Sequence, residues 1–315
     1  MNFDKIAKVI FKAQKIALFS HTRPDGDTIG GVLALKNALQ SIGKHCDAFC
    51  DNNIPEKFFY LPEADSFMLF PQEKYDLYIA VDCGELARLG ENFQVFTREK
   101  NTVNIDHHMT NDNFAAINCV MEYSSTCEIV FELLKFMKVQ IDEKSAICMY
   151  TGLSTDTGNF AHSNTNEHTF ETARELVKFD IDIAKLNFVL YRNTSFERTK
   201  LLGKVISRMR RYEDGQISLI YTLTSDMQEV GADASFTEGF IDYATNVEGT
   251  EVGISLCQHA ENTFKVSMRS RGKIDVSKIC SEFGGGGHRN ASGCMVSGLF
   301  EDVVDKIVRA VSFEL

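Results

Sequence analysis

KIALFSHTRPDGDTIGG, residues 15–31, holds the pattern from which the fold can be worked out. Residues 15–21 are a short apolar run that ends in polar side chains, which is typical of a buried β-strand. A run of small residues from about 28 to 42 then predicts a helix. The turn between them carries His21, Asp25 and Asp27. In an open α/β sheet such a turn lies at the carboxyl end of the strand, where ligands bind.

The rest of the first half repeats this alternation of strand and helix. Further strands are predicted at residues 45–50, 75–82 and 101–106, and an amphipathic helix at 124–137. Alternation of this kind favours an α/β fold, in which a parallel sheet is covered by helices on both faces. We assign residues 1–185 to this N-terminal domain.

A second pattern begins after about residue 185. Residues 186–214 are charged and mostly helical, which indicates a helical connector. Strand patterns follow at 217–223, 252–262 and 263–272, and helical stretches separate them. We therefore expect residues 215–315 to form a smaller α+β domain, with a cleft where the two domains face each other.

The composition is that of an ordinary globular protein, since 44% of the 315 residues are hydrophobic and 24% are charged. The net charge of −11 disfavours binding to long duplex DNA, which proteins usually grip through a basic face. It does not exclude a short nucleotide, because bound divalent cations would reverse the charge locally.

Two further features bear on the location of the protein. No apolar run approaches the roughly 18 residues of a membrane span, and the N-terminal segment is an amphipathic helix pattern rather than a signal peptide. The nine cysteines include no CxxC pair, which argues for reduced thiols. We therefore expect a cytoplasmic protein that makes no membrane contact.

Acidic and histidine side chains gather at four places that the pattern puts at strand ends or in the turns after them. The four clusters are His21 with Asp25 and Asp27, Asp82, Asp106 with His107 and His108, and Asp156. Each has an ordinary alternative: Asp25 and Asp82 suit turns, His107 and His108 suit a packed pair, and Asp156 suits a helix cap. Their common position at one edge of the predicted sheet favours a single site instead.

The residue types in this site indicate bound metal ions. Five aspartates gathered at one place would repel and raise one another's pKa values, and two divalent cations would relieve that repulsion. Carboxylate oxygens with imidazole nitrogens suit Mn²⁺, Mg²⁺, Fe²⁺ or Zn²⁺. A pair of metals about 3.5–4 Å apart is the usual arrangement for hydrolysing a phosphate ester.

The motif set resembles that of the DHH phosphoesterase family. The order is H-x-x-P-D-x-D, then D, then D-H-H, then D within T-G-x-x-T-D-T-G, and the GGGGH run at 284–288 with ASG at 291–293 resembles the associated DHHA1 domain. The resemblance covers almost the whole chain, and the layout is most similar to the NrnA-type branch. That branch acts on very short RNAs, and many members remove the 3′-phosphate of 3′-phosphoadenosine 5′-phosphate (pAp).

The resemblance implies a role for each matching residue. His21 and Asp25 would hold one metal, and Mn²⁺ is the ion that the family resemblance implies. The second metal would be held by Asp27, His107 and Asp156. Asp82 would bridge the two metals, Asp106 would orient a ligand, and His108 would face the scissile phosphate.

Substrate-binding residues are expected in the second domain. Glycines permit positive φ and close backbone approach, so Gly286 and Gly287 with His288 would form a phosphate cradle, although a glycine-rich turn is the alternative. In the family, the arginine that matches Arg269 binds a substrate phosphate. Arg271 is better explained as a solvated charge.

The expected activity is Mn²⁺-dependent hydrolysis of short oligoribonucleotides such as pApA and pGpG, and of pAp to AMP. A metal-bound hydroxide would attack phosphorus while His108 and His288 stabilise the developing charge. Three alternatives remain: a cyclic-dinucleotide phosphodiesterase, a pyrophosphatase of the related DHHA2 type, and a nucleotide-binding module without catalysis. A homodimer is the expected assembly, since dimers are common among soluble proteins.

Overall fold

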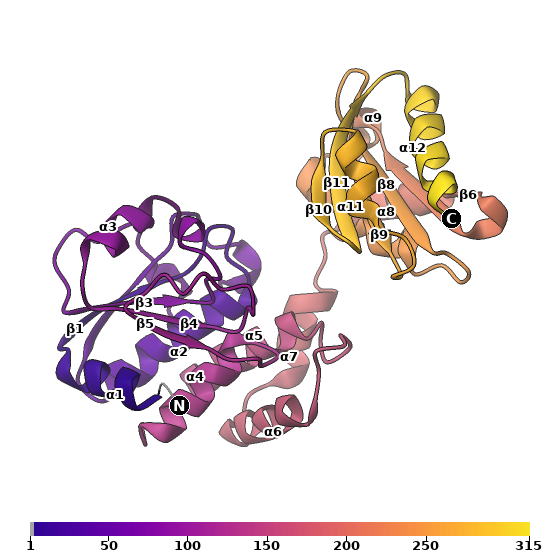
Figure 1. Cartoon of the computed structure of the whole chain (residues 1–315). Coiled ribbons are helices and arrows are strands. Elements are labelled where there is room, and N and C mark those ends of the chain that lie inside the picture. Colours follow the sequence, from indigo (N-terminus) through magenta and orange to yellow (C-terminus); the bar gives the residue numbers. More distant parts are fainter. Residues whose placement is uncertain (1–2) are drawn as a thin grey trace. The chain divides into compact units, whose positions relative to one another are not determined.

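A computed structural model describes residues 3–315 of the chain. The chain divides into two compact units, Met1–Asn193 and Thr194–Leu315. Each unit has its own sheet and its own hydrophobic core, and Figure 1 shows the elements of both. The first two residues of the predicted N-terminal helix lie outside the described range.

The first unit is built on a five-stranded sheet in the order β2-β1-β3-β4-β5, and every neighbouring pair of strands is parallel. The strands are β1 (Lys15–Phe19), β2 (His45–Phe49), β3 (Leu77–Val81), β4 (Thr102–Asp106) and β5 (Ile117–Val120). The predicted parallel α/β sheet is confirmed. The strand β5 was not predicted, because it is only four residues long and only one of them is buried.

Both faces of this sheet are buried. Along β1, Ile16 and Leu18 face one core while Ala17 and Phe19 face the other, because successive side chains of a strand point to opposite faces. Parallel sheets covered in this way carry nearly continuous apolar strands, and all five residues of β3 are buried. The sheet is therefore the rigid base from which the following turns project.

Helices pack on the two faces of the sheet (Figure 1). The first core packs between one face and the helices α1 (Phe3–Lys12), α2 (Gly26–Ser41), α4 (Thr126–Phe136) and α5 (Glu143–Asp156). The opposite face is covered by α3 (Phe93–Arg98) and the preceding 3-10 segment. They contribute Phe96 and Leu89 to a separate core on that face of the first unit. The unit ends with α6 (Glu167–Leu176), α7 (Ile183–Asn187) and a π-helix, Phe188–Arg192.

Glycines allow α2 and α5 to pack at backbone contact. A Cβ atom at Gly30 would lie 2.3 Å from the carbonyl oxygen of Cys148, and one at Gly152 would lie 2.6 Å from the Asp27 carboxylate. Neither position has room for a side chain. This close approach carries the end of α5, with Asp156, to the start of α2, with Asp27.

The second unit contains a six-stranded mixed sheet in the order β10-β11-β9-β8-β7-β6. Its strands are β6 (Arg210–Tyr212), β7 (Ile217–Thr222), β8 (Val252–Ala260), β9 (Thr263–Ser270), β10 (Gly286–His288) and β11 (Ala291–Ser297). Its helices are α8 (Phe196–Ser207), α9 (Thr224–Val230), α10 (Phe240–Thr245), α11 (Val276–Glu282) and α12 (Phe300–Glu314). One face packs against α11 and α12, and α8 and α10 pack against part of the other, so the predicted α+β domain is present.

The segment predicted as a helical connector, residues 186–214, does not form a separate element. The division between the units falls inside it, after Asn193. Helix α8 belongs to the second unit because it buries Leu201 and Val205 in a core with Phe240. Charged residues on the outer side of α8 gave the segment the pattern of an exposed linker.

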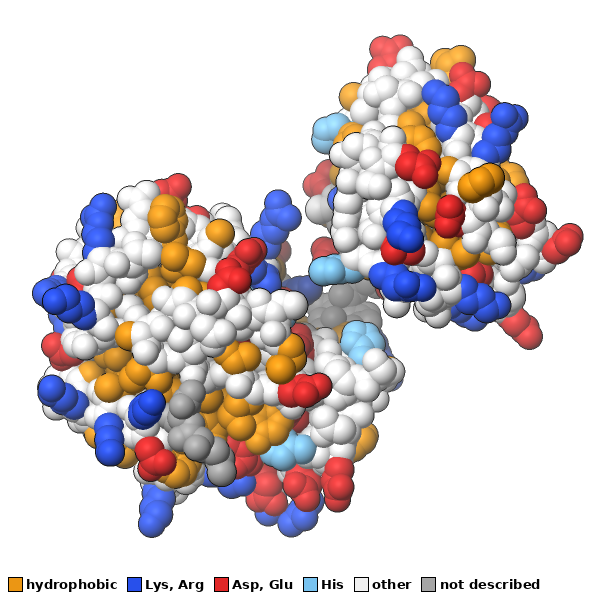
Figure 2. Space-filling view, viewed as in Figure 1, with side chains coloured by type: hydrophobic (Ala, Val, Ile, Leu, Met, Phe, Trp, Pro, Cys, Tyr) orange, Lys and Arg blue, Asp and Glu red, His pale blue; other side chains and the backbone are white. Residues whose placement is uncertain are grey.

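Acidic and basic side chains are interspersed over the visible surface of each unit (Figure 2). Among residues 3–315, no helix is both long enough and apolar enough to cross a membrane.

We predict that Gly30→Ala lowers the thermal unfolding midpoint of the first unit. The added methyl group would overlap the Cys148 carbonyl, and overpacking of this kind costs about 1–3 kcal/mol. Gly203→Ala in α8 is the matched control, since a Cβ atom there meets open space and alanine favours the helix by up to about 1 kcal/mol. Calorimetry of both variants would test this, and equal midpoints would contradict the packing argument.

Candidate active site

Three of the predicted site residues lie at or just after the ends of parallel strands. His21 lies two residues beyond β1, Asp82 is the first residue after β3, and Asp106 is the last residue of β4, before His107. Since these three strands are neighbours in the sheet, their carboxyl ends meet at one edge.

Asp25 and Asp27 come from the start of α2. Asp25 is the N-cap, and its Oδ1 accepts hydrogen bonds from the backbone N–H groups of Asp27 and Thr28 at 3.1 and 3.2 Å. Its other oxygen faces His21. The helix-cap explanation and the ligand explanation therefore both apply to this residue, one to each oxygen.

Asp156 reaches the site in a different way from that predicted. It is the last residue of α5 and does not follow a strand. The small and apolar residues before it belong to the buried side of a helix that packs on α2, and a run of that kind does not distinguish a strand from a buried helix.

The carboxylate of Asp82 connects two groups of potential ligands. Its Oδ2 lies 3.5 Å from His21 Nε2, and its Oδ1 lies 3.7 Å from His107 Nε2. His21 Nε2 is also 3.7 Å from Asp25, and His107 Nε2 is 3.2 Å from Asp156. Two sets of donor atoms have all members within 4.8 Å of one another, namely His21, Asp25 and Asp82, and Asp27, His107 and Asp156.

The backbone holds Asp82 in an unusual conformation. Its φ is +61°, in the left-handed region that residues other than glycine seldom adopt. The Thr126 hydroxyl donates to Asp82 Oδ1 at 2.9 Å, which fixes the carboxylate once the turn has placed it. Strain at a residue that faces both ligand groups is typical of a functional position.

Asp27 is fully buried and is bound by the start of α4. Its two carboxylate oxygens accept from the backbone N–H groups of Thr126 at 2.6 Å and Cys127 at 2.9 Å. A helix N-terminus favours a negative charge, so α4 stabilises this aspartate. Even so, burial and the nearby charges of Asp82 and Asp156 raise the pKa of Asp27 well above its usual value.

The remaining pKa shifts show how the site balances its charge without a cation. Burial, with repulsion from Asp82 and Asp25, raises the pKa of Asp156 to about 8. Burial would lower the pKa of His21, but contacts with Asp25 and Asp82 outweigh it and raise that pKa to about 10. The same His21 contact, together with backbone N–H donors, overcomes the effect of burial on Asp25 and lowers its pKa to about 2.

These residues fit a pair of divalent cations. The donor atoms are carboxylate oxygens and imidazole nitrogens in two adjacent sets; Asp82 belongs to the first set, and its Oδ1 lies 3.7 Å from His107 Nε2 in the second. His21 Nδ1 lies 2.8 Å from the Thr22 carbonyl, and Nε2 is the ring nitrogen that faces Asp25 and Asp82. The raised pKa values of His21, Asp27 and Asp156 mean that a metal ion binding here would displace protons from its ligands.

The structure assigns Asp106 a different partner from the metal ligand suggested by the sequence. Asp106 Oδ1 lies 2.8 Å from His108 Nδ1, and Asn111 donates to its Oδ2 at 2.6 Å. His107 is oriented by a backbone group instead, since its Nδ1 lies 3.2 Å from the Tyr123 carbonyl. Asp106 therefore positions His108, and its hydrogen bond raises the pKa of that histidine.

In the second unit, Arg269 and His288 lie on the same face of the sheet. Arg269 pairs with Ala291, and Ala291 pairs with His288, so the three residues form one row across β9, β11 and β10. Directly paired residues point to the same face, and strand spacing separates the outer two by about 10 Å. Among residues 3–315, no carboxylate lies within ion-pair distance of the Arg269 guanidinium.

The glycine run contributes a short edge strand, which the sequence did not predict. Gly286 and Gly287 pair with Gly293 and Ser292 in β11. Gly287 has a φ of +149°, and a Cβ atom there would lie 2.6 Å from the Ala291 carbonyl. The run is required for this tight hairpin, which presents the exposed His288 at its end.

Comparison with known proteins identifies the family. Residues 15–153 match the model of the DHH family, N-terminal domain, and residues 199–313 match that of the DHHA1 domain. A protein from Thermus thermophilus described as a bifunctional oligoribonuclease and PAP phosphatase NrnA is 31% identical over 95% of this chain and 90% of its own length. The chain belongs to the DHH/DHHA1 phosphoesterase family.

Other similar proteins extend this likeness. A Bacillus subtilis protein with the same description is 24% identical over 93% of this chain and 92% of its own. The crystal structure of an exopolyphosphatase-related protein from Bacteroides fragilis superimposes with a TM-score of 0.90 and 29% identity, covering 99% of this chain and 95% of that one. RecJ from Thermus thermophilus in complex with Mn²⁺ shares the fold, with a TM-score of 0.53 and 15% identity over 99% of this chain and 55% of its own.

The sequence did not predict several residues that contact the ligand cluster of the first unit. They are Arg88, Asn111, Tyr123 and Thr126. Thr126 had a signal, because a Ser-Thr pair just before an amphipathic helix marks a helix N-terminus, where backbone N–H groups can bind a carboxylate. Tyr123 acts through its carbonyl group, which no residue type reveals.

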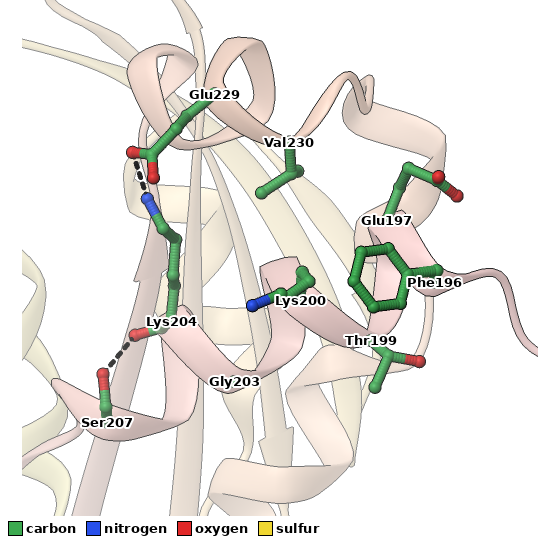
Figure 3. A pocket seen from close by; sticks show the side chains of 9 residues that line it. All are labelled: Phe196, Glu197, Thr199, Lys200, Gly203, Lys204, Ser207, Glu229 and Val230. Atoms are coloured by element: carbon green, nitrogen blue, oxygen red, sulfur yellow. Dashed lines mark hydrogen bonds and ion pairs between the residues drawn. The ribbon is translucent and has the colours of Figure 1, made fainter.

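Two pockets lie in the DHHA1 unit. One of about 420 Å³ adjoins Arg269 and is also lined by Ser255, Lys265 and Ser267. The other, of about 630 Å³, lies between α8 and α9. Phe196 and Val230 face this pocket, and Lys204 forms an ion pair with Glu229 (Figure 3). The second pocket contains none of the residues that the motifs selected.

We predict that the metal-free protein loses stability as the pH rises from about 5 to about 8. The folded-state pKa of Asp156 is raised from 3.8 to about 8 and that of His21 from 6.5 to about 10, so over this range the folded state keeps protons that the unfolded chain has lost or is losing. The free energy of unfolding then falls with pH.

Thermal unfolding in a chelator, at several pH values, would measure this slope. Asp156→Asn should reduce it. Metal ions need deprotonated ligands, so Mn²⁺ should raise the unfolding midpoint more at pH 8 than at pH 5. A midpoint of the chelated protein that rises between pH 5 and 8 would contradict the charge balance described above.

Proposed function

We propose that the protein is a Mn²⁺-dependent phosphoesterase that hydrolyses short oligoribonucleotides to mononucleotides and converts pAp to AMP. The observation that carries the proposal is the Asp82 carboxylate, whose two oxygens face two separate ligand groups. The described activities of the Thermus thermophilus and Bacillus subtilis relatives support this choice of substrate.

The metal pair, when bound, would polarise the phosphoryl group and supply a hydroxide nucleophile at neutral pH. The protein's own residues set the geometry. The Asp82 carboxylate faces His21 with one oxygen and His107 with the other, and the start of α4 holds Asp27 by hydrogen bonds. His108 keeps its Nδ1 on Asp106, which leaves its Nε2–H to donate to a phosphoryl oxygen as negative charge develops.

The DHHA1 unit would bind the rest of the substrate. Arg269 has no carboxylate partner among residues 3–315, and it shares a sheet face with His288 and with the small residues between them. A guanidinium and an imidazole on an open face suit a terminal phosphate. A terminal phosphate held at one fixed place would favour substrates of one or two nucleotides.

We predict that Asp82→Ala reduces turnover of a 5′-phosphorylated dinucleotide by more than about 100-fold. Mutation of a residue that only supports a metal ligand already lowers metal affinity or activity by about 10- to 100-fold. Bound Mn²⁺, measured by elemental analysis, should fall from two ions per chain. The exposed Asp65 provides a control, because Asp65→Ala should leave both quantities unchanged. Full activity of the Asp82→Ala variant would contradict the proposed mechanism.

The substrate is tested by comparing rates with Mn²⁺ on pApA, pGpG, a longer RNA, pAp and cyclic di-AMP. We expect the linear dinucleotides and pAp to be hydrolysed fastest. Hydrolysis of pAp without the dinucleotides would rule out the oligoribonuclease activity. A preference for cyclic di-AMP would favour the cyclic-dinucleotide alternative, and tight binding without hydrolysis would favour a binding module.

We predict that Arg269→Ala raises KM for pApA by about 10- to 100-fold, the range expected for a lost charged hydrogen bond. The value of kcat should change less, since Arg269 would bind a phosphate that does not react. Arg271→Ala is the matched control, because Arg271 is exposed and lies just beyond β9. Steady-state kinetics would measure both, and equal KM values for the two variants would refute the role of Arg269.

A further inference from the structure

One basic side chain of the first unit reaches the ligand cluster, and no motif selected it. Arg88 lies in the 3-10 segment Leu86–Asn92, six residues after Asp82. Its Nη2 lies 3.1 Å from His21 Nδ1 and 3.3 Å from His21 Nε2. Its backbone is fixed as well, because the Arg88 carbonyl accepts from the Thr22 N–H at 2.7 Å.

The pairing of this guanidinium is incomplete. Five aspartates surround the site, yet among residues 3–315 no carboxylate lies within 4.0 Å of the Arg88 nitrogens. The residue is half-buried, and His21 is its side-chain partner. A guanidinium has five N–H donors in a planar fork, so most of this capacity remains available for an oxyanion.

Arg88 lies beside the middle of the ligand cluster. Its neighbour His21 has Nε2 3.5 Å from Asp82 Oδ2, and His108 Nδ1 lies 3.7 Å from Asp82 Oδ1. Arg88 is therefore in contact with one of the two histidines that lie on either side of Asp82.

We propose that Arg88 is a catalytic residue that donates hydrogen bonds to a non-bridging oxygen of the phosphoryl group undergoing hydrolysis. The inference rests on the proposed function and deepens it. Negative charge on the phosphoryl oxygens must be stabilised as the reaction proceeds, and a fixed arginine is well suited to this task. The competing explanation is that Arg88 only compensates the aspartates until metal ions bind.

The two explanations differ in what they predict for metal and for phosphate. Arg88→Gln, Arg88→Lys and the control Arg98→Gln, which alters an exposed arginine of α3, would be prepared in the full-length chain. Calorimetric titration would measure Mn²⁺ binding to the metal-free proteins. A second titration would measure binding of inorganic phosphate to the Mn²⁺-loaded proteins.

If Arg88 contacts the phosphoryl group, Arg88→Gln should keep two Mn²⁺ sites with affinities within about threefold of wild type. Its affinity for phosphate should fall by about 10- to 100-fold, as expected for charge-assisted hydrogen bonds. Its kcat on pApA should fall by about 100- to 1,000-fold, whereas its KM should change far less in either direction. Arg88→Lys should recover only part of both losses, because lysine lacks the planar fork.

Two results would overturn the proposal. Unchanged phosphate affinity in Arg88→Gln would show that the side chain does not reach the phosphoryl oxygens. A loss of Mn²⁺ affinity greater than about tenfold in both Arg88 variants would show that the residue maintains the metal site instead. If the wild-type enzyme hydrolysed none of the nucleotides, the proposed function would fail, whereas the phosphate titration would still decide the role of Arg88.

Discussion

The repulsion among buried aspartates is the constraint on which the rest of this structure depends. The charges of Asp82 and Asp156 raise the pKa of Asp27, and the charge of Asp82 raises the pKa of Asp156. Hydrogen bonds offset this repulsion: the start of α4 donates two backbone N–H groups to Asp27, and the Thr126 hydroxyl donates to Asp82. These bonds hold the two carboxylates in place while leaving lone pairs for a cation.

The scaffold around these acids is correspondingly rigid. All three loops that follow β1, β3 and β4 leave a sheet whose two faces are buried. Helices α2 and α5 touch through glycines, so the distance between Asp27 and Asp156 is set by backbone contact rather than by flexible side chains. The fold itself thus brings the donor groups together, and a metal ion that binds them would release protons.

The sequence predicted the parallel sheet, the second domain and the gathering of acids and histidines, because these depend on local patterns and on one general rule for strand ends. It placed Asp156 after a strand because an apolar run does not distinguish a strand from a buried helix. It gave Asp106 a metal ligand as partner, whereas the neighbouring His108 takes that place. Arg88 and the Tyr123 carbonyl were missed, since their roles depend on three-dimensional contacts that no spacing encodes. The boundary between the units differs from the predicted one because α8 buries only Leu201 and Val205. Its other residues are largely polar or charged, so the sequence pattern resembled that of an exposed linker.

The N-cap role of Asp25 has a consequence for how this protein would hold a metal ion. One oxygen of Asp25 begins α2, and the other faces His21, so the same side chain belongs to a folding equilibrium and to a ligand set. The two processes are thermodynamically linked: a cation that binds Asp25 opposes fraying of the first turn of α2, and any change that frays this turn weakens the cation's hold. Inherited variation near the start of this helix can therefore tune metal occupancy while every ligand residue stays the same.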